Sequence, residues 1–292
     1  MVAKGLNAEP EKDFELLSLI HPKLVQLNYE SSEVKKQLIL GSFFFYFGTY
    51  IFSMIVSPVI FSSYKNLGTK EKVFWHLAIV RSVFGFFAGF VGLWALFTPT
   101  NLDRDVVFGT TATTYFAIAT TVGFFTFECT ALMISDIIFR NYSMLLNLHH
   151  WLTLVGYTIV LYSGSSHFFA GKGIVLEMST PFSALCWTML KCGKEKSFLW
   201  KANQFFLVHT FHCRSIVECY LLFTAYKNWD YIYTQMPSPV FYALFIQLPI
   251  ITFVMTPYWT YKKTVQMVQQ KDWNFEDSEK GASTNGSIKK EA

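Results

Sequence analysis

Charged side chains are scarce in this sequence. They make up 15% of its 292 residues, whereas hydrophobic residues make up 52% and aromatic residues 18%. A soluble domain usually carries about 25% charged residues, so the composition argues against a soluble enzyme. The net charge is only +4, and the basic residues lie in loops rather than in one stripe, which excludes nucleic acid as an expected partner. The balance predicts an integral membrane protein.

The sequence also lacks the common cofactor and metal motifs. It contains no P-loop and no GxGxxG, and none of its five cysteines forms the CxxC spacing of a zinc site. The cysteines are expected to be buried free thiols. The first residues, MVAKGLNAEPEKDFELL, have no apolar core of the kind found in a signal peptide. The first membrane span is therefore expected to act as the insertion signal.

Long apolar runs are plentiful. Runs of about 20 apolar residues are long enough to cross the hydrocarbon core as helices. Seven such spans are predicted, at residues 38–61, 73–97, 113–136, 143–162, 166–190, 200–224 and 239–260. The expected fold is an all-α integral membrane protein. Its expected parts are an N-terminal tail (1–37), a membrane domain (38–262) and a cytosolic C-terminal tail (263–292).

Basic residues near span ends predict the orientation. Most of them follow the first, fifth and seventh spans: Lys65, Lys70, Lys72, Lys191, Lys194, Lys196, Lys201, Lys262, Lys263 and Lys271. Seven spans place these three regions on one side, which is expected to be cytosolic. Lys35 and Lys36 disagree, because they adjoin the first span on the other side. An even number of spans would remove that disagreement.

The last four residues contain a candidate retrieval signal. Lys289 and Lys290 stand at the fourth and third positions from the end. This dilysine pattern is the one that coat proteins read to return membrane proteins to the endoplasmic reticulum, and such a C-terminal signal is an address and not an anchor. The expected location is the endoplasmic reticulum membrane, with cycling through the ER–Golgi intermediate compartment.

Ionisable side chains occur where the spans are predicted. Ten of them lie within or close to spans: His76, Arg81, Glu128, His149, His150, Glu177, His209, His212, Arg214 and Glu218. Such groups are costly in hydrocarbon and mark function by default. Their number predicts a polar cavity between the helices.

The sixth predicted span is polar on two sides. At about 100° per residue, His209 and His212 share one face, whereas Asn203, Arg214 and Glu218 share nearly the opposite face. Protein is therefore expected to surround this helix. Arg214 and Glu218 are spaced i,i+4 and can pair. The alternative to a functional role is a structural ion pair that orders the bundle.

Two adjacent histidines, His149 and His150, lie within the fourth span. Neighbours on a helix point about 100° apart, so one can line a cavity while the other contacts its wall. A dehydrated imidazole stays neutral and can act as a base or a nucleophile. The alternative is two core histidines bonded to carbonyls. The seven histidines of the chain are too few for a histidine-box oxygenase. No metal is expected, and a single zinc ion is the alternative.

These residues resemble the TLC domain (TRAM–Lag–CLN) family. The double histidine in a membrane helix and the acidic, hydroxyl-rich segment LEMSTPF (176–182) carry the resemblance. Further similar stretches are EKVFWHLAIVRSVFG (71–85), GLWALF (92–97), FLWKANQ (198–204), HTFHCR (209–214), PYWTYKKT (257–264) and DWNF (272–275). The match covers roughly residues 40–275.

The resemblance implies a barrel-like bundle of membrane helices around a cavity open to the cytosol. Ceramide synthases are the acyltransferases of this family, and their double histidine, matched here by His149 and His150, acts on acyl-coenzyme A. They follow it with an HDxSD-type segment, whereas this sequence has one acid there, Glu177, beside Ser179 and Thr180. This departure argues against the acceptor that ceramide synthases use.

The expected function is therefore an acyl-CoA-dependent O-acyltransferase, with acyl-CoA as co-substrate. His149, His150 and Glu177 are the expected catalytic residues. Because guanidinium pairs with phosphate oxygens, Arg81 and Arg214 indicate a phosphate-bearing acceptor. Glycerophosphoglycerol or a lysophospholipid, on the way to bis(monoacylglycero)phosphate, fits this description. The residues expected to bind substrate are Arg81, Asn203, His209, His212, Arg214 and Glu218.

Two other functions are considered. A cargo receptor cycling between endoplasmic reticulum and Golgi with newly made lysosomal enzymes would use the dilysine tail. It would leave the buried ionisable groups unexplained, and the predicted lumenal loops are short. A lipid sensor without chemistry would keep the cavity but would not need both histidines. The expected partners are membrane lipids, coat proteins, lysosomal enzymes in the receptor alternative, and a second copy of the chain.

Overall fold

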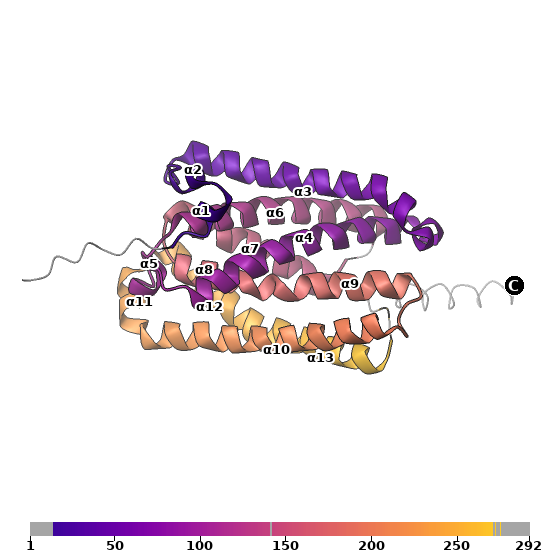
Figure 1. Cartoon of the computed structure of the whole chain (residues 1–292). Coiled ribbons are helices and arrows are strands. Elements are labelled where there is room, and N and C mark those ends of the chain that lie inside the picture. Colours follow the sequence, from indigo (N-terminus) through magenta and orange to yellow (C-terminus); the bar gives the residue numbers. More distant parts are fainter. Residues whose placement is uncertain (1–13, 141, 271, 273–274, 276–292) are drawn as a thin grey trace, which may run out of the picture.

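The computed structural model describes residues 14–140, 142–270, 272 and 275. These residues form helices and connecting loops, and no β-strand occurs among them. Long helices lie side by side along one axis (Figure 1). They are α3 (Ser32–Ile60), α4 (Thr69–Phe97), α6 (Ala112–Phe139), α7 (Met144–Ser163) and α10 (Phe198–Lys227). The predicted all-α membrane architecture is confirmed.

Six helical segments of the described chain are long and apolar enough to cross a membrane. They are Ser32–Ile60, Thr69–Phe97, Ala112–Phe139, Met144–Ser163, His167–Lys191 and Ser238–Val268. The sixth predicted span, at 200–224, coincides with α10 and is the predicted span that these six segments do not include. This helix has the length of a span, at 30 residues, but not the apolar composition of the other six. The polar residues that it carries account for the difference.

The fifth predicted span is a broken helix. It consists of α8 (His167–Gly173), the 3₁₀ turn η2 (Ile174–Ser179) and α9 (Thr180–Lys191). The segment lies closely against α4, because a Cβ added at Gly92 would be 2.5 Å from the backbone nitrogen of Val175. Small residues allow such close contact between membrane helices. This packing fixes η2, and with it Glu177, against α4.

The seventh predicted span is longer than expected. α12 (Ser238–Ile250), a π-helical turn (Ile251–Met255) and α13 (Thr256–Val268) follow one another without a loop. The helix therefore continues beyond 260, the expected end of the span, and beyond the expected domain boundary at 262. Pro249 and Pro257 flank the π-helical turn. Proline removes a helical N–H donor, and π-helical turns often occur at functional sites.

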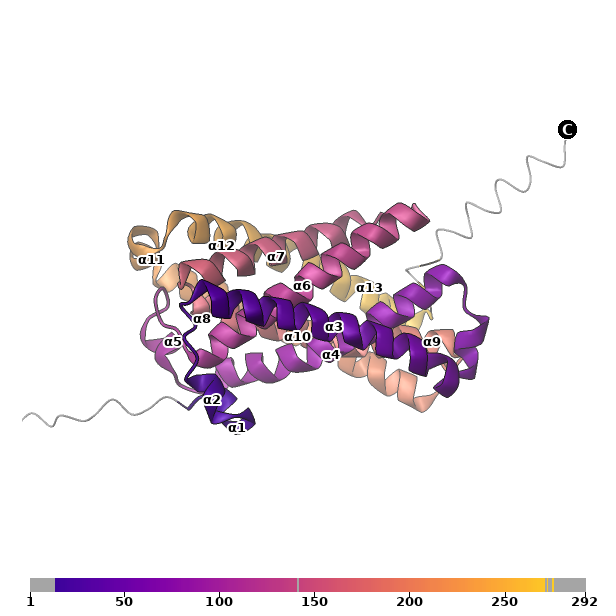
Figure 2. The same ribbon diagram turned by 90° about the horizontal axis from the view of Figure 1, so that it is seen from above.

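The short helices gather at one end of the bundle. Figures 1 and 2 show α1 (Leu17–Ile20), α2 (Pro22–Val25), α5 (Asn101–Arg104) and α11 (Trp229–Gln235) there. Glu15 accepts hydrogen bonds from the backbone N–H groups of Ala112 and Thr113, both at 2.9 Å. A carboxylate satisfies the free donors at a helix N-terminus. Part of the predicted N-terminal tail is therefore packed onto the bundle.

The opposite end carries the lysine-rich loops and is called the basic end. It comprises η1 (Ser62–Asn66), residues 192–197 and the end of α13. Lys191 Nζ lies 2.5 Å from Glu71 Oε1 and 2.7 Å from Asp272 Oδ2, so the ends of α9, α4 and the chain after α13 meet here. That this end faces the cytosol stays a prediction, as does the dilysine signal, because Lys289 and Lys290 lie outside the described residues.

Lys35 does not behave as a free loop charge. It is 6% exposed, and its Nζ lies 5.6 Å from the ring centre of Tyr115 and 5.5 Å from that of Tyr162. An ammonium over aromatic faces is stabilised by cation–π attraction. The protein therefore encloses one of the two lysines that disagree with the predicted orientation.

Aromatic side chains fill the core between α3, α4 and α6. Phe84 and Phe124 stack with ring centres 3.8 Å apart, and Tyr46 lies edge-on to both. Aromatic residues contribute large buried areas and specific geometry to a core. This rigid packing supports the helices that carry the candidate site.

Candidate functional site

Two cavities of different character meet in the middle of the bundle. The polar cavity extends toward the basic end and, together with the open space that adjoins it, has a volume of about 1450 Å³. Its lining includes Arg81, Ser143, His150, Trp259, Lys262 and Lys263. The apolar cavity, together with the open space that adjoins it, has a volume of about 810 Å³. Among the described residues, three side chains border both cavities: His149, Glu177 and Arg214.

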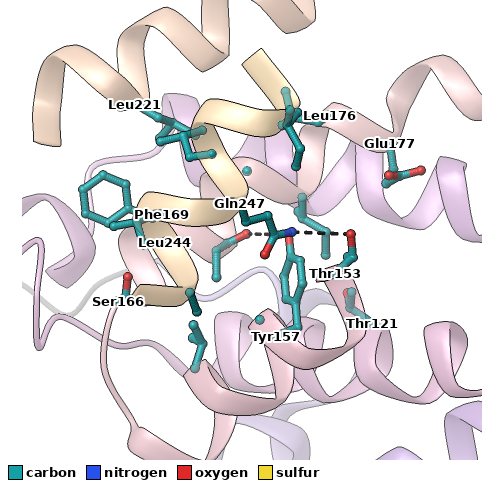
Figure 3. A pocket seen from close by; sticks show the side chains of 18 of the residues that line it. Thr121, Thr153, Tyr157, Ser166, Phe169, Leu176, Glu177, Leu221, Leu244 and Gln247 are labelled. Carbon is teal, nitrogen blue, oxygen red and sulfur yellow. Dashed lines mark hydrogen bonds between the residues drawn. The ribbon is translucent and has the colours of Figure 1, made fainter. Parts of the chain in front are cut away.

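The apolar cavity extends from the junction toward the end opposite the basic end. Figure 3 shows Glu177 on one side of it, Ser166 on the other, and Thr153 and Gln247 between them. Helix α7 provides one wall with residues spaced three or four apart, which share a helical face. These residues are His149, Thr153, Gly156, Tyr157 and Val160. The same helix therefore carries the histidine and lines the apolar cavity beyond it.

His149 faces a carboxylate. Its Nε2 lies 3.4 Å from Glu177 Oε1, and its ring stands edge-on to Trp259 with ring centres 5.3 Å apart. Its Nδ1 is buried and has no hydrogen-bond partner among the described residues. Nε2 is therefore the ring nitrogen that meets the carboxylate at the junction.

Glu177 is held by its own turn. The 3₁₀ turn η2 places Thr180 three residues further on, and its hydroxyl donates to Glu177 Oε2 at 2.8 Å. This bond occupies one carboxylate oxygen and leaves Oε1 directed at His149. The broken fifth span thus serves to position an acid at the junction of the two cavities.

His150 points elsewhere, as expected for a helical neighbour. Its Nδ1 donates to the carbonyl of Leu146 at 2.7 Å, so in the neutral ring Nε2 is an acceptor. That Nε2 lies 4.0 Å from Glu128 Oε1. Glu128 is completely buried and forms an ion pair with Arg81, whose Nε lies 2.6 Å from Oε1. His150 borders the polar cavity but not the apolar one. Its ring is held by the backbone carbonyl of Leu146, as the core-histidine alternative predicts.

Arg214 reaches the junction from α10. It is 4% exposed, and its Nη1 donates to Ser179 Oγ at 3.1 Å. Its Nε and Nη2 have no hydrogen-bond partner in the described part of the chain. Its guanidinium carbon lies 5.8 Å from the ring centre of Trp259. Buried polar groups are normally paired, so two unpaired guanidinium donors indicate a place for an anion.

Arg214 and Glu218 do not form the expected pair within the described structure. Arg214 bonds to Ser179 of η2, whereas Glu218 Oε1 accepts from the hydroxyl of Thr256 at 2.6 Å on α13. Asn203 donates to the carbonyl of Phe182 at 2.8 Å and holds α9 to α10. Neither Glu218 nor Asn203 borders the two cavities. Their predicted contact with substrate is not supported by this placement.

His209 and His212 lie on the exposed face of α10 and outside both cavities. Their rings are 5.9 Å apart, and His209 Nδ1 donates to the carbonyl of Phe205 at 2.7 Å. The prediction that protein surrounds both polar faces of this helix is wrong for this face. A histidine can satisfy a ring donor on the preceding turn of its own helix, so it needs no partner from a second helix.

Several residues that border the cavities were not predicted from the sequence to do so. Trp259, Lys263 and Gln266 border the polar cavity and are spaced four and three residues apart on α13. That spacing was readable as a helical face, but the span was expected to end at 260. Gln247 was a second missed signal, because it is a lone amide within the apolar run of α12.

The chain is similar to known proteins over most of its length. The family model for the TLC domain matches residues 74–264, which include both histidines and Glu177. Protein CLN8 of Mus musculus is 36% identical over 272 residues, covering 91% of this chain and 94% of that protein. Protein CLN8 of Homo sapiens is 35% identical over 257 residues, covering 88% and 90%. Protein CLN8 of Canis lupus familiaris is 34% identical over 270 residues, covering 91% and 94%. No solved structure matches the chain significantly.

Proposed function

This chain belongs to the TLC-domain family, with the CLN8 proteins among its relatives, and we propose that it is an acyl-CoA-dependent O-acyltransferase. The proposed acceptor is a phosphate-bearing lipid or lipid precursor with a free hydroxyl. Glycerophosphoglycerol and lysophospholipids fit, in the direction of bis(monoacylglycero)phosphate. The proposed location is the endoplasmic reticulum membrane.

One observation carries the proposal: a polar and an apolar cavity meet at a histidine–carboxylate pair. Acyl-CoA is itself divided in this way, into a phosphate-bearing nucleotide and an apolar chain joined by a thioester. With the chain in the apolar cavity and the nucleotide toward Lys262 and Lys263, the thioester lies beside His149. Holding reactants in such an orientation lowers the barrier of a bimolecular reaction.

The proposed chemistry needs one base. In neutral His149 the Nε2–H group faces the Glu177 carboxylate at 3.4 Å, so Nδ1, which has no hydrogen-bond partner in the described structure, is the basic nitrogen. Nδ1 takes the proton of the acceptor hydroxyl as the hydroxyl oxygen attacks the thioester carbonyl, and the Glu177 carboxylate stabilises the imidazolium that forms. The carbon–sulfur bond then breaks, and the imidazolium returns the proton to the leaving thiolate. The products are the ester and coenzyme A, and His149 is neutral again.

The phosphates of coenzyme A and the phosphate of the acceptor are proposed to bind to different basic residues. Lys262 and Lys263, toward the basic end, suit the phosphates of coenzyme A. Arg214, with two unpaired N–H donors in the described structure, suits the phosphate of the acceptor, because a guanidinium can meet two phosphate oxygens at once. Arg81 is already paired with Glu128. Its proposed role changes from binding substrate to supporting the wall beside His150.

The other two functions make different demands on the junction. A lipid sensor would keep the apolar cavity but would not need His149 and Glu177 to face each other. A cargo receptor would need neither cavity. The paired groups at the junction therefore favour the acyltransferase.

The test is acyl transfer by purified protein supplied with acyl-CoA and candidate acceptors, with products identified by mass spectrometry. His149→Ala is expected to lower turnover by roughly 10²–10⁴-fold, the usual contribution of a general base. His212→Ala, on the exposed face of α10, is the matched control and is expected to keep wild-type turnover. Wild-type turnover by a folded His149→Ala protein would overturn the mechanism. An inactive wild-type protein with every acceptor would overturn the function.

A further inference from the structure

An amide crosses the apolar cavity. Gln247 projects from α12, and its Nε2 donates to Thr153 Oγ1 on α7 at 3.4 Å (Figure 3). The Thr153 hydroxyl in turn donates to the carbonyl of His149 at 2.7 Å. Gln247 is thus linked to the backbone of the histidine that borders both cavities.

A glycine makes this crossing possible. A Cβ added at Gly156 would lie 2.3 Å from Gln247 Oε1, far inside van der Waals contact. With glycine at this position, the amide oxygen can lie directly against α7. The side chain therefore obstructs the cavity between two helices and does not merely line one wall.

The Gln247 amide forms fewer hydrogen bonds than it is able to form, although its surroundings are apolar. A glutamine side chain offers two donor hydrogens and an acceptor oxygen. Within the described residues Gln247 makes only the long bond to Thr153. Its neighbours on α12 that line the same cavity, Leu244 and Leu248, are apolar. Burying an amide whose donors and acceptor are not all paired lowers the stability of the fold. This cost indicates that Gln247 has a function in the cavity.

The position of the amide along the cavity suggests that function. Gly156 is seven residues beyond His149, which is about 10 Å along α7 at 1.5 Å per residue. The cavity continues past this level to Val160, Phe169 and Ser166. An extended long acyl chain whose thioester lies at His149 reaches Gln247 near its middle. To continue, the chain must bend around the amide.

We propose that Gln247, placed against Gly156, selects long acyl chains with a cis double bond near the middle. This inference rests on the proposed function in assigning the apolar cavity to an acyl chain. A cis double bond supplies a fixed bend, so the chain enters with less conformational ordering than a saturated one. The free amide N–H can also face the π electrons of the double bond, a weak interaction that adds to the fit. A trans double bond offers the same π electrons without the bend.

The test compares oleoyl, elaidoyl and stearoyl chains, because oleate and elaidate differ only in the geometry of one double bond. Binding to purified protein is measured as displacement of radiolabelled oleoyl-CoA, and turnover is measured separately. Wild-type protein is expected to prefer oleoyl over elaidoyl and stearoyl by about tenfold, equivalent to about 1.4 kcal/mol. Gln247→Ala, which opens the cavity, is expected to reduce the preference to near unity.

Two further variants sharpen the test. Gln247→Leu keeps much of the bulk but removes the amide, so a preserved preference would assign the selection to shape and a lost one to the hydrogen bond. Both outcomes support a role for residue 247. Thr121→Val, which removes a hydroxyl elsewhere on the same cavity, is the control and is expected to keep the wild-type preference.

The failures are distinguishable. Equal binding of oleoyl and elaidoyl chains by the wild-type protein, or an unchanged preference in Gln247→Ala, would overturn the inference while leaving acyl transfer intact. A preference in binding that depends on Gln247, without turnover of any acceptor, would overturn the acyltransferase and leave the chain selection standing. Absence of any acyl-chain binding would overturn both.

Discussion

Arg81 and Glu128 form an ion pair between α4 and α6, in which Nε and Nη2 of the arginine both contact Oε1 of the glutamate. Glu128 is completely buried, and its Oε2 has no hydrogen-bond partner in the described structure. His150 Nε2 lies 4.0 Å from the same Oε1. The pair therefore forms part of the wall that holds the second histidine. The buried charge of Glu128 is therefore expected to need Arg81 for the stability of the fold.

Removing Arg81 is expected to act on stability. Arg81→Met leaves the Glu128 carboxylate buried without its partner, which typically costs about 3–5 kcal/mol. The double variant Arg81→Met with Glu128→Leu is expected to recover most of that loss, because no buried charge remains. Thermal unfolding of the purified variants in detergent measures both effects. If Arg81→Met unfolds like the wild type yet fails to use the acceptor, the original assignment of Arg81 to substrate binding is correct.

Arg214 is expected to determine acceptor use. Arg214→Lys keeps the charge but loses the planar pair of donors. Loss of one charge-assisted hydrogen bond, about 1.5–3 kcal/mol, would lower acceptor turnover by roughly 10- to 100-fold. Acyl-CoA binding is expected to stay unchanged. Both quantities are measured on the same preparation.

The charge exchange Arg214→Glu with Glu218→Arg is a stricter version of this test. Residue 214 faces Ser179, whereas residue 218 faces Thr256, so the exchange moves the cation by one helical turn, about 5.4 Å. Oriented catalysis tolerates far smaller displacements. Acceptor turnover is therefore expected to be lost. Wild-type turnover in the exchanged protein would reduce Arg214 to a structural residue.

Lys262 and Lys263 are expected to recognise the nucleotide part of acyl-CoA. Replacing both by alanine is expected to raise the KM for acyl-CoA by about tenfold or more, in line with the loss of one or two charge-assisted bonds to phosphate. Acyl-pantetheine, which has no nucleotide, is expected to be used equally well by variant and wild type. Lys201→Ala, an exposed lysine near the same end, is the control. An equal rise in KM for both thioesters would contradict this assignment.

The sequence by itself determined the class of protein and the direction of side chains within each helix. Scarce charge and long apolar runs are sufficient for a membrane bundle, because crossing hydrocarbon imposes both. Helical periodicity is equally local: it separates His149 from His150, and it places Arg214 away from His209. The double histidine could therefore be selected as a candidate site from the residues alone, and the resemblance to the TLC domain added Glu177 to it.

Only the tertiary structure decided which side chains from different helices meet. The distance from His149 to Glu177 depends on a broken helix pressed against Gly92 of α4, and no pattern within residues 166–190 reveals that contact. In the described structure Arg214 bonds to Ser179 and not to Glu218, although the i,i+4 spacing allowed the pair with Glu218. The rotation of each helix about its axis is set by packing against its neighbours. Periodicity fixes relative angles within one helix, and the contacts of the bundle decide which face of α10 turns inward.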